Sequence, residues 1–226
     1  MSTSADSAPE TPVNGYALWA VFRRNPAETP NDSDLAHPLG RIAERGVTIR
    51  GFYDVSGLRA DADLMIWLHG PVAEDLQWAL REIRRNKLFS PLLPTWNAMG
   101  VHRDAEFNRS HVPGFLRGER ARDWLVLYPF DRSYDWYILE EGDRRRMLAD
   151  HGRKGAEFTS VVANTVSAFA LGDYEWILPM ESDSLTDLVD MMRALRNTEA
   201  RMHVRGETPF FTGRRIEASE ILEVIR

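Results

Sequence analysis

The sequence of 226 residues predicts an α+β protein made of two successive β-α-β-β-α-β units. An apolar strand candidate opens each unit, Tyr16 to Arg23 in the first and Asp123 to Phe130 in the second. A late amphipathic helix in each unit ends on the same dipeptide, Arg85-Asn86 and then Arg196-Asn197. The recurrence of these landmarks in the same order indicates two related halves.

The elements between the landmarks also repeat. The first unit continues with a polar helical segment, two strand candidates, a helix with an apolar stripe, and a closing strand: 34–45, 48–55, 64–68, Leu76/Leu80/Ile83, 94–101. The second unit continues in the same way: 134–151, 161–170, 174–178, Leu185/Leu188/Val189/Met192/Leu195, 209–216. The early part of 161–170 is equally compatible with the end of a helix.

Each unit therefore follows the ferredoxin-like order, in which one sheet face is left uncovered by the unit's own helices. Two such faces can meet and enclose a pocket for a flat ligand, or they can form a solid core; periodicity supports both. We assign residues 1–14 to a disordered tail, 15–105 to the first repeat, 106–122 to a connector, and 123–226 to the second repeat.

Composition and charge exclude several classes of function. The net charge of −6 argues against a nucleic-acid partner, and the absence of cysteine excludes thiolate ligands, disulfides and iron–sulfur clusters. The sequence contains no run of about 18 apolar residues, so it predicts no membrane-spanning helix. The start lacks the basic and apolar regions of a signal peptide, so we expect a cytoplasmic protein without a membrane partner.

No phosphate-binding loop, GxSxG or HExxH motif is present, and no two of the six histidines have zinc-ligand spacing. His151 precedes Gly152 and Gly155, and on a helix Gly155 would leave the face beside the imidazole bare. Taken alone, this segment is more commonly explained by a histidine at a glycine-capped helix end. Tyr128 lies on one strand face with Trp124, and core packing is the usual role of such a tyrosine.

Five further candidate site residues could equally have an ordinary structural role. His111 lies in the connector, where a histidine is normally solvated. Arg132, Arg201 and Arg205 could be surface charges, and Trp176 could be a core residue.

Taken together, several segments resemble the coproheme decarboxylases of the chlorite dismutase-like family, in the branch with a distal histidine. The resemblance runs from about Gly15 to Arg226 and rests on the order and spacing of five segments: Tyr128-Pro129-Phe130, Trp136-Tyr137, His151-Gly152-x-x-Gly155, Asp173-Tyr174-Glu175-Trp176, Pro209-Phe210-Phe211-Thr212-Gly213-Arg214-Arg215. It implies two ferredoxin-like repeats in an antiparallel β-barrel-like body of the dimeric α/β-barrel type. It also implies a homopentamer, with a porphyrin in the C-terminal half.

The resemblance implies that Fe-coproporphyrin III (coproheme) is both substrate and cofactor, and that hydrogen peroxide drives loss of two propionate carboxyls to give haem b. It implies His151 as the proximal iron ligand, Tyr128 as the redox-active tyrosine and His111 as the distal histidine. Arg132 and Arg201 would hold propionates, with Arg205 and Trp176 as further porphyrin contacts. A ferrochelatase or a haem acceptor is the implied protein partner.

One departure from the family pattern is informative. Chlorite dismutases carry an arginine thirteen positions after the proximal histidine, where this sequence has Asn164, so we expect poor chlorite turnover. Asn164 is then a candidate porphyrin contact in place of that arginine. The remaining alternatives are a haem carrier without catalysis, a weak chlorite dismutase or peroxidase, and an α/β-barrel protein without porphyrin.

Overall fold

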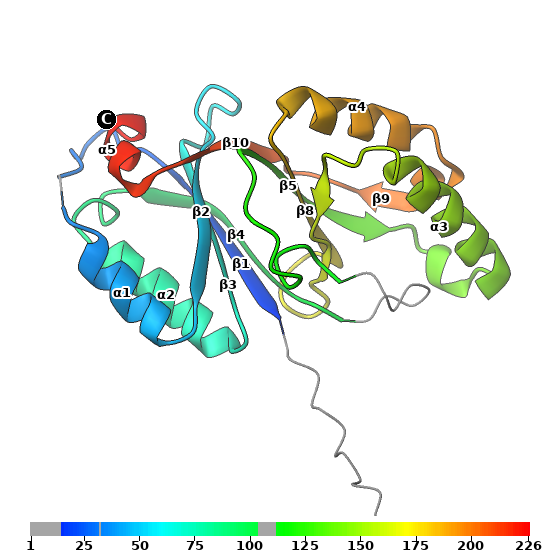
Figure 1. Cartoon of the computed structure of the whole chain (residues 1–226), viewed down its shortest axis with the longest axis horizontal. Coiled ribbons are helices and arrows are strands. Elements are labelled where there is room, and N and C mark those ends of the chain that lie inside the picture. Colours follow the sequence, from blue (N-terminus) through cyan, green and yellow to red (C-terminus); the bar gives the residue numbers. More distant parts are fainter. Residues whose placement is uncertain (1–14, 32, 104–111) are drawn as a thin grey trace, which may run out of the picture.

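The computed structural model describes residues 15–31, 33–103 and 112–226 (Figure 1). The first half contains four strands and two helices: β1 (Tyr16–Arg23), α1 (Ala36–Glu44), β2 (Thr48–Asp54), β3 (Leu64–Gly70), α2 (Ala73–Arg85), β4 (Leu93–Val101). Every element predicted for this half is present in the predicted order. Helix α2 ends at Arg85, as the repeated dipeptide indicates.

The second half begins with a strand, a 3₁₀ turn and a helix: β5 (Trp124–Arg132), η1 (Trp136–Ile138), α3 (Glu141–Gly155). Three strands and a helix follow: β6 (Val162–Ala163), β7 (Val166–Ser167), β8 (Trp176–Ser182), α4 (Leu185–Arg196). The chain then closes with short elements: η2 (Glu199–His203), β9 (Val204–Gly206), β10 (Phe211–Ile216), η3 (Ala218–Glu220), α5 (Ile221–Val224).

Two details of this half differ from the sequence-based prediction. The segment 161–170 is neither one strand nor a helix end, because α3 stops at Gly155 and the chain forms two separate two-residue strands. Between these strands Asn164 turns its side chain to the connector and to Glu181, so regular pairing is interrupted there. The extra strand β9, which pairs with β5, was not predicted.

The strands form one antiparallel sheet that closes on itself. The order runs β6-β8-β7-β4-β1-β3-β2-β10-β5-β9, and β5 also pairs with β8. The two halves exchange partners, because β10 pairs with β2 and β4 pairs with β7. The predicted α+β class with an antiparallel, barrel-like body is therefore confirmed.

The space inside the barrel is filled by side chains. Trp19, Trp67, Tyr53 and Phe211 are buried there, and the rings of Trp19 and Trp67 lie 5.3 Å apart. Of the two alternatives, a solid core is correct, and a flat ligand between the sheets is wrong.

The helices cover the outer faces of the barrel. Figure 1 shows α1 and α2 over the first half and α3 and α4 over the second. Alternation along β5 sends Leu125 and Leu127 into the barrel and Val126 and Tyr128 towards α4. Tyr128 therefore lies between the sheet and the helices. Among the described residues, none of the helices is both long and apolar enough to cross a bilayer.

Candidate active site

A small cavity of about 70 Å³ lies between the outer face of the second-half sheet and its helices. Four predicted site residues line it together: Tyr128 and Arg132 from β5, His151 from α3, and Arg201 from η2. A larger hollow of about 440 Å³, lined by Ile42 and Phe52, lies under α1 and contains none of the predicted residues. The four residues converge although up to 73 positions separate them in the sequence.

Tyr128 is almost completely buried and its hydroxyl faces a sulfur atom. The phenol ring stacks on Phe210 with the ring centres 4.3 Å apart, and the hydroxyl donates to Met192 Sδ at 3.6 Å. Burial raises the pKa of Tyr128 well above its usual value, and the nearby Glu207 raises it further. The hydroxyl therefore stays protonated throughout the physiological pH range.

His151 presents a buried imidazole nitrogen that nothing in the described part of the chain satisfies. Its Nδ1 atom is inaccessible to solvent and has no hydrogen-bond partner there. Burial lowers the pKa of His151, and the Arg132 guanidinium lowers it further, so the neutral ring is favoured. A neutral imidazole is the form that binds a metal ion.

The arginines give the cavity a positive wall. Arg201 and Arg196 both pair with Glu207, at 2.8 Å and 2.7 Å. The Arg132 guanidinium lies over the Trp136 ring at 4.1 Å, and the backbone N–H of Arg132 donates to the Glu175 carboxylate at 2.7 Å. Among the described residues that line the cavity, three arginines accompany one carboxylate, and such a wall suits an anionic ligand.

Two predicted contacts lie just outside the cavity. Trp176 stacks on Phe130, a cavity residue, with parallel rings and centres 6.2 Å apart. Arg205 donates to the Tyr134 hydroxyl at 3.2 Å on the exposed side of β9. Direct porphyrin contact by either residue stays a prediction.

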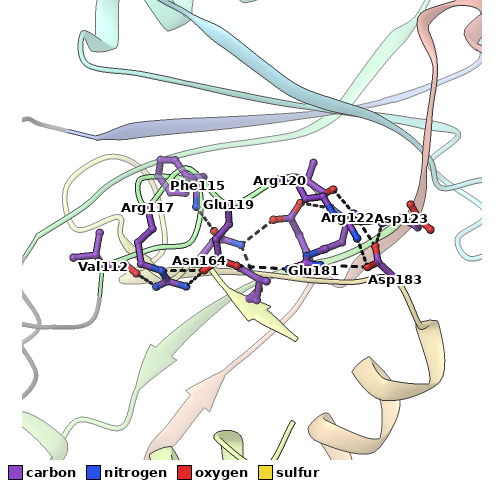
Figure 2. Close-up of polar contacts among 12 residues, drawn as sticks. Val112, Phe115, Arg117, Glu119, Arg120, Arg122, Asp123, Asn164, Glu181 and Asp183 are labelled. Carbon is purple, nitrogen blue, oxygen red and sulfur yellow. Dashed lines mark hydrogen bonds and ion pairs between the residues drawn. The ribbon is translucent and has the colours of Figure 1, made fainter. Parts of the chain in front are cut away.

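Asn164 lies in a different place, at the junction of the connector with the barrel (Figure 2). Its side-chain oxygen accepts the Phe115 N–H at 2.9 Å, and its side-chain nitrogen donates to Glu181 at 3.1 Å. Glu181 in turn forms a buried ion pair with Arg50 of β2 at 2.6 Å. These bonds use both ends of the amide and indicate a structural role for Asn164, and its contact with a porphyrin stays a prediction.

The guanidinium of Arg50 completes the junction. It donates to the carbonyl oxygens of Glu119 and Arg120 at 3.0 Å and 3.2 Å. A single buried ion pair thus joins the first-half sheet, the connector and the second-half sheet. His111, the predicted distal histidine, lies outside the described residues.

The cavity residues that sequence reasoning missed include Arg196, Glu207 and Met192. Arg196 was noted in the sequence as part of the Arg-Asn dipeptide that ends the second amphipathic helix. Periodicity does not show, however, that its side chain faces a cavity. Glu207 precedes the closing strand in a segment without periodicity, so nothing in the pattern pointed to it.

Comparison with known proteins identifies the family. The chlorite dismutase family model matches residues 32–216. The coproheme decarboxylase of Mycolicibacterium smegmatis is 47% identical over 213 residues, which cover 92% of this chain and 92% of that protein. The chain belongs to the chlorite dismutase family.

Solved structures of the family share the fold at much lower identity. A mutant chlorite dismutase from Candidatus Nitrospira defluvii superposes with a TM-score of 0.78 at 20% identity, covering 94% of this chain and 96% of that one. The enzyme from the same organism in complex with imidazole gives 0.75 at 20% identity, covering 92% and 94%. These matches establish the family fold for nearly the whole chain.

The residues of the cavity fit an iron porphyrin that carries carboxylates. The imidazole of His151 lines the cavity and is neutral, which is the form in which a histidine would ligate a haem iron. The Gly155 backbone lies one turn later, where an added Cβ would be 3.5 Å from Met191. The predicted bare face of the helix is therefore covered by α4 in this structure.

The cavity is smaller than a porphyrin, since about 70 Å³ holds roughly two waters at ~30 Å³ each. Flexible side chains of α4, Met192 and Leu195, form one wall. A methionine fills irregular space and moves at low cost, so this wall can yield to a flat ligand.

Proposed function

We propose that this chain is a coproheme decarboxylase that converts two propionates of Fe-coproporphyrin III to vinyl groups and produces haem b, the last step of coproporphyrin-dependent haem biosynthesis. The observation that carries the proposal is the convergence of Tyr128, His151 and two predicted arginines on one cavity. The similarity to the Mycolicibacterium smegmatis coproheme decarboxylase supports the choice of substrate.

The reaction balances with one hydrogen peroxide for each propionate. The propionate loses a hydrogen atom from its β-carbon, then one electron and CO₂, and the remaining two carbons become a vinyl group. The peroxide is reduced to two waters by these two electrons and two protons. The iron porphyrin is the substrate and, when bound, supplies the peroxide chemistry itself.

Tyr128 is the group that we assign to hydrogen abstraction. Its raised pKa keeps the phenol protonated, so oxidation removes a proton and an electron together and leaves a neutral tyrosyl radical. That radical takes the hydrogen atom from the propionate and becomes a phenol again. The stacked Phe210 ring and the surrounding apolar side chains keep water away from the radical.

His151 and the arginines bind and orient the substrate. The neutral imidazole of His151 would hold the iron through one of its ring nitrogens. Arg132 and Arg201 hold propionates through charge-assisted hydrogen bonds, and Arg196 joins them from the end of α4. Glu207 holds Arg201 and Arg196 in place before the substrate binds.

His111 remains the predicted distal base. A neutral histidine has an unperturbed pKa of about 6.5 and could accept the first proton of the peroxide. We also infer a homopentamer, and a ferrochelatase or haem acceptor as the partner that exchanges porphyrin with the protein. Both inferences rest on the family resemblance.

Peroxide titration of the coproheme complex, followed by mass spectrometry of the porphyrin, tests the proposal. An enzyme yields haem b with release of CO₂, through an intermediate that has lost one carboxyl group. A haem carrier would bleach its porphyrin without those products, and a protein that binds no porphyrin would give no Soret band.

A further inference from the structure

A tyrosine at the surface, Tyr137 in η1, is bonded to a carboxylate. Its hydroxyl donates to Glu175 Oε2 at 2.8 Å, while 37% of the residue remains exposed to solvent. The same carboxylate oxygen accepts the Arg132 N–H at 2.7 Å, which fixes its position. A phenol with a carboxylate acceptor can release its proton locally when it loses an electron.

Aromatic rings connect Tyr137 to the cavity. Phe130 lines the cavity and stacks on Trp176 with the two rings inclined by 13°. The indole N–H of Trp176 donates to the Tyr137 hydroxyl at 3.4 Å. A hydrogen bond therefore joins the oxidisable side chains of Trp176 and Tyr137, and Phe130 lies between Trp176 and the cavity.

We propose that Tyr137 is an exit site through which the protein oxidises small reducing molecules, of the phenol or ascorbate class, with oxidising equivalents left over at the porphyrin. Trp176 gives one electron to the oxidised site, and Tyr137 then reduces Trp176 while passing its phenolic proton to Glu175. The donor in solution returns one electron to Tyr137, Glu175 returns the proton, and the donor releases its own proton to water. This inference rests on the proposed function, which supplies the oxidant.

Neither Tyr128 nor Tyr134 combines these features. Tyr128 is buried and its hydroxyl faces Met192 Sδ, so a donor in solution cannot reach it. Tyr134 is 82% exposed, but its oxygen accepts a hydrogen bond from Arg205. Burial raises the pKa of Tyr137 to about 12, and Glu175 contributes to this rise. Tyr137 therefore starts as a phenol whose proton already points at an acceptor.

The test uses the protein loaded with haem b, the product, so that decarboxylation does not compete. Hydrogen peroxide is added with guaiacol as the donor, and a nitroso spin trap followed by peptide mapping locates the protein radical. In the wild type we expect the trap on Tyr137. Tyr137→Phe and Glu175→Gln should each lower guaiacol oxidation at least several-fold, and the porphyrin should bleach faster.

Tyr134→Phe is the matched control and should leave both the adduct and the guaiacol rate unchanged. A wild-type adduct that maps to another residue, or a Tyr137→Phe rate equal to that of the wild type, would overturn the proposal. Spin-trap mapping of the wild type decides the question even if a variant fails to fold.

A parallel measurement separates this inference from the proposed function. Tyr137→Phe loaded with coproheme should still release CO₂ and make haem b. If the wild type makes no haem b, the proposed function fails, and the adduct on Tyr137 in the haem b complex still reports on the exit site.

Discussion

The side-chain oxygen of Asn164 accepts the backbone N–H of Phe115 at 2.9 Å, and this bond fastens the connector to the second-half sheet. The other end of the amide donates to Glu181, which is paired with Arg50 of the first half. Asn164 thus serves the junction of the two repeats in this chain.

Replacement of Asn164 by leucine should destabilise the protein. A buried donor or acceptor left unsatisfied costs about 1–3 kcal/mol, and this change leaves the Phe115 N–H without its acceptor. Urea unfolding of the porphyrin-free protein measures the loss. Asn97→Leu on the exposed face of β4 is the control and should change stability little. Equal stabilities of the two variants would argue against the junction.

His69 should make stability depend on pH. Burial, with a further contribution from Arg50, lowers the pKa of His69 to about 4, whereas the unfolded value is about 6.5. As the pH falls, the unfolded chain therefore binds the proton before the folded chain does. The stability contributed by neutral His69 is complete above pH 6.5 and is lost as the pH falls towards 4. Relative to His69→Phe, the wild type should lose up to about 3 kcal/mol between pH 7 and pH 4. Parallel pH profiles of the two proteins would show that His69 does not titrate in this way.

The order of elements was predictable because apolar periodicity survives in each segment. The apolar stripe from Leu185 to Leu195 predicted the position of α4 in the sequence, and the repeated Arg-Asn dipeptides predicted where α2 and α4 end. Closure of the barrel was not predictable from periodicity, since the pairing of β10 with β2 joins residues more than 150 positions apart. The same limit explains why alternation alone left Tyr128 equally open to core packing, whereas the structure places it on the face towards α4.

The candidate site was predictable only in part. The family resemblance supplied Tyr128, Arg132, His151 and Arg201, which do share one cavity. The junction contacts of Asn164 were not predictable, because a position alone does not say which way its side chain points. Glu207 was not predicted as a site residue, because its role depends on Arg196 and Arg201, which only the folded chain brings together.

Removal of the His151 imidazole should affect the complex more than the free protein. Since its buried Nδ1 has no partner in the described residues, His151→Ala should cost little hydrogen-bond energy in the porphyrin-free state. The ferric complex should bind porphyrin more weakly or show a changed spin-state spectrum. Absorbance titration with coproheme measures both effects, with the exposed His37→Ala as control. An unaltered spectrum would assign the iron to another ligand.

The cavity arginines should be distinguishable from surface arginines by affinity. Arg201→Gln or Arg132→Gln removes a charge-assisted bond worth about 1.5–3 kcal/mol, so coproheme should bind roughly 10- to 150-fold more weakly. A stalled product that has lost only one carboxyl group should also accumulate. Arg193→Gln, on the exposed side of α4, is the matched control. If the cavity variants bind as tightly as the control, the propionates are held elsewhere, and Arg205 becomes the next residue to replace.

The most direct test of the account is product analysis of Tyr128→Phe. Phenylalanine keeps the stacking on Phe210 and removes only the hydroxyl, so the variant should fold and bind coproheme as the wild type does. A phenyl ring cannot form the oxygen radical that abstracts hydrogen. The complex should therefore consume peroxide at the iron while releasing almost no CO₂ and forming almost no haem b. Haem b formation at a rate near that of the wild type would contradict the role of Tyr128 and the mechanism built on it.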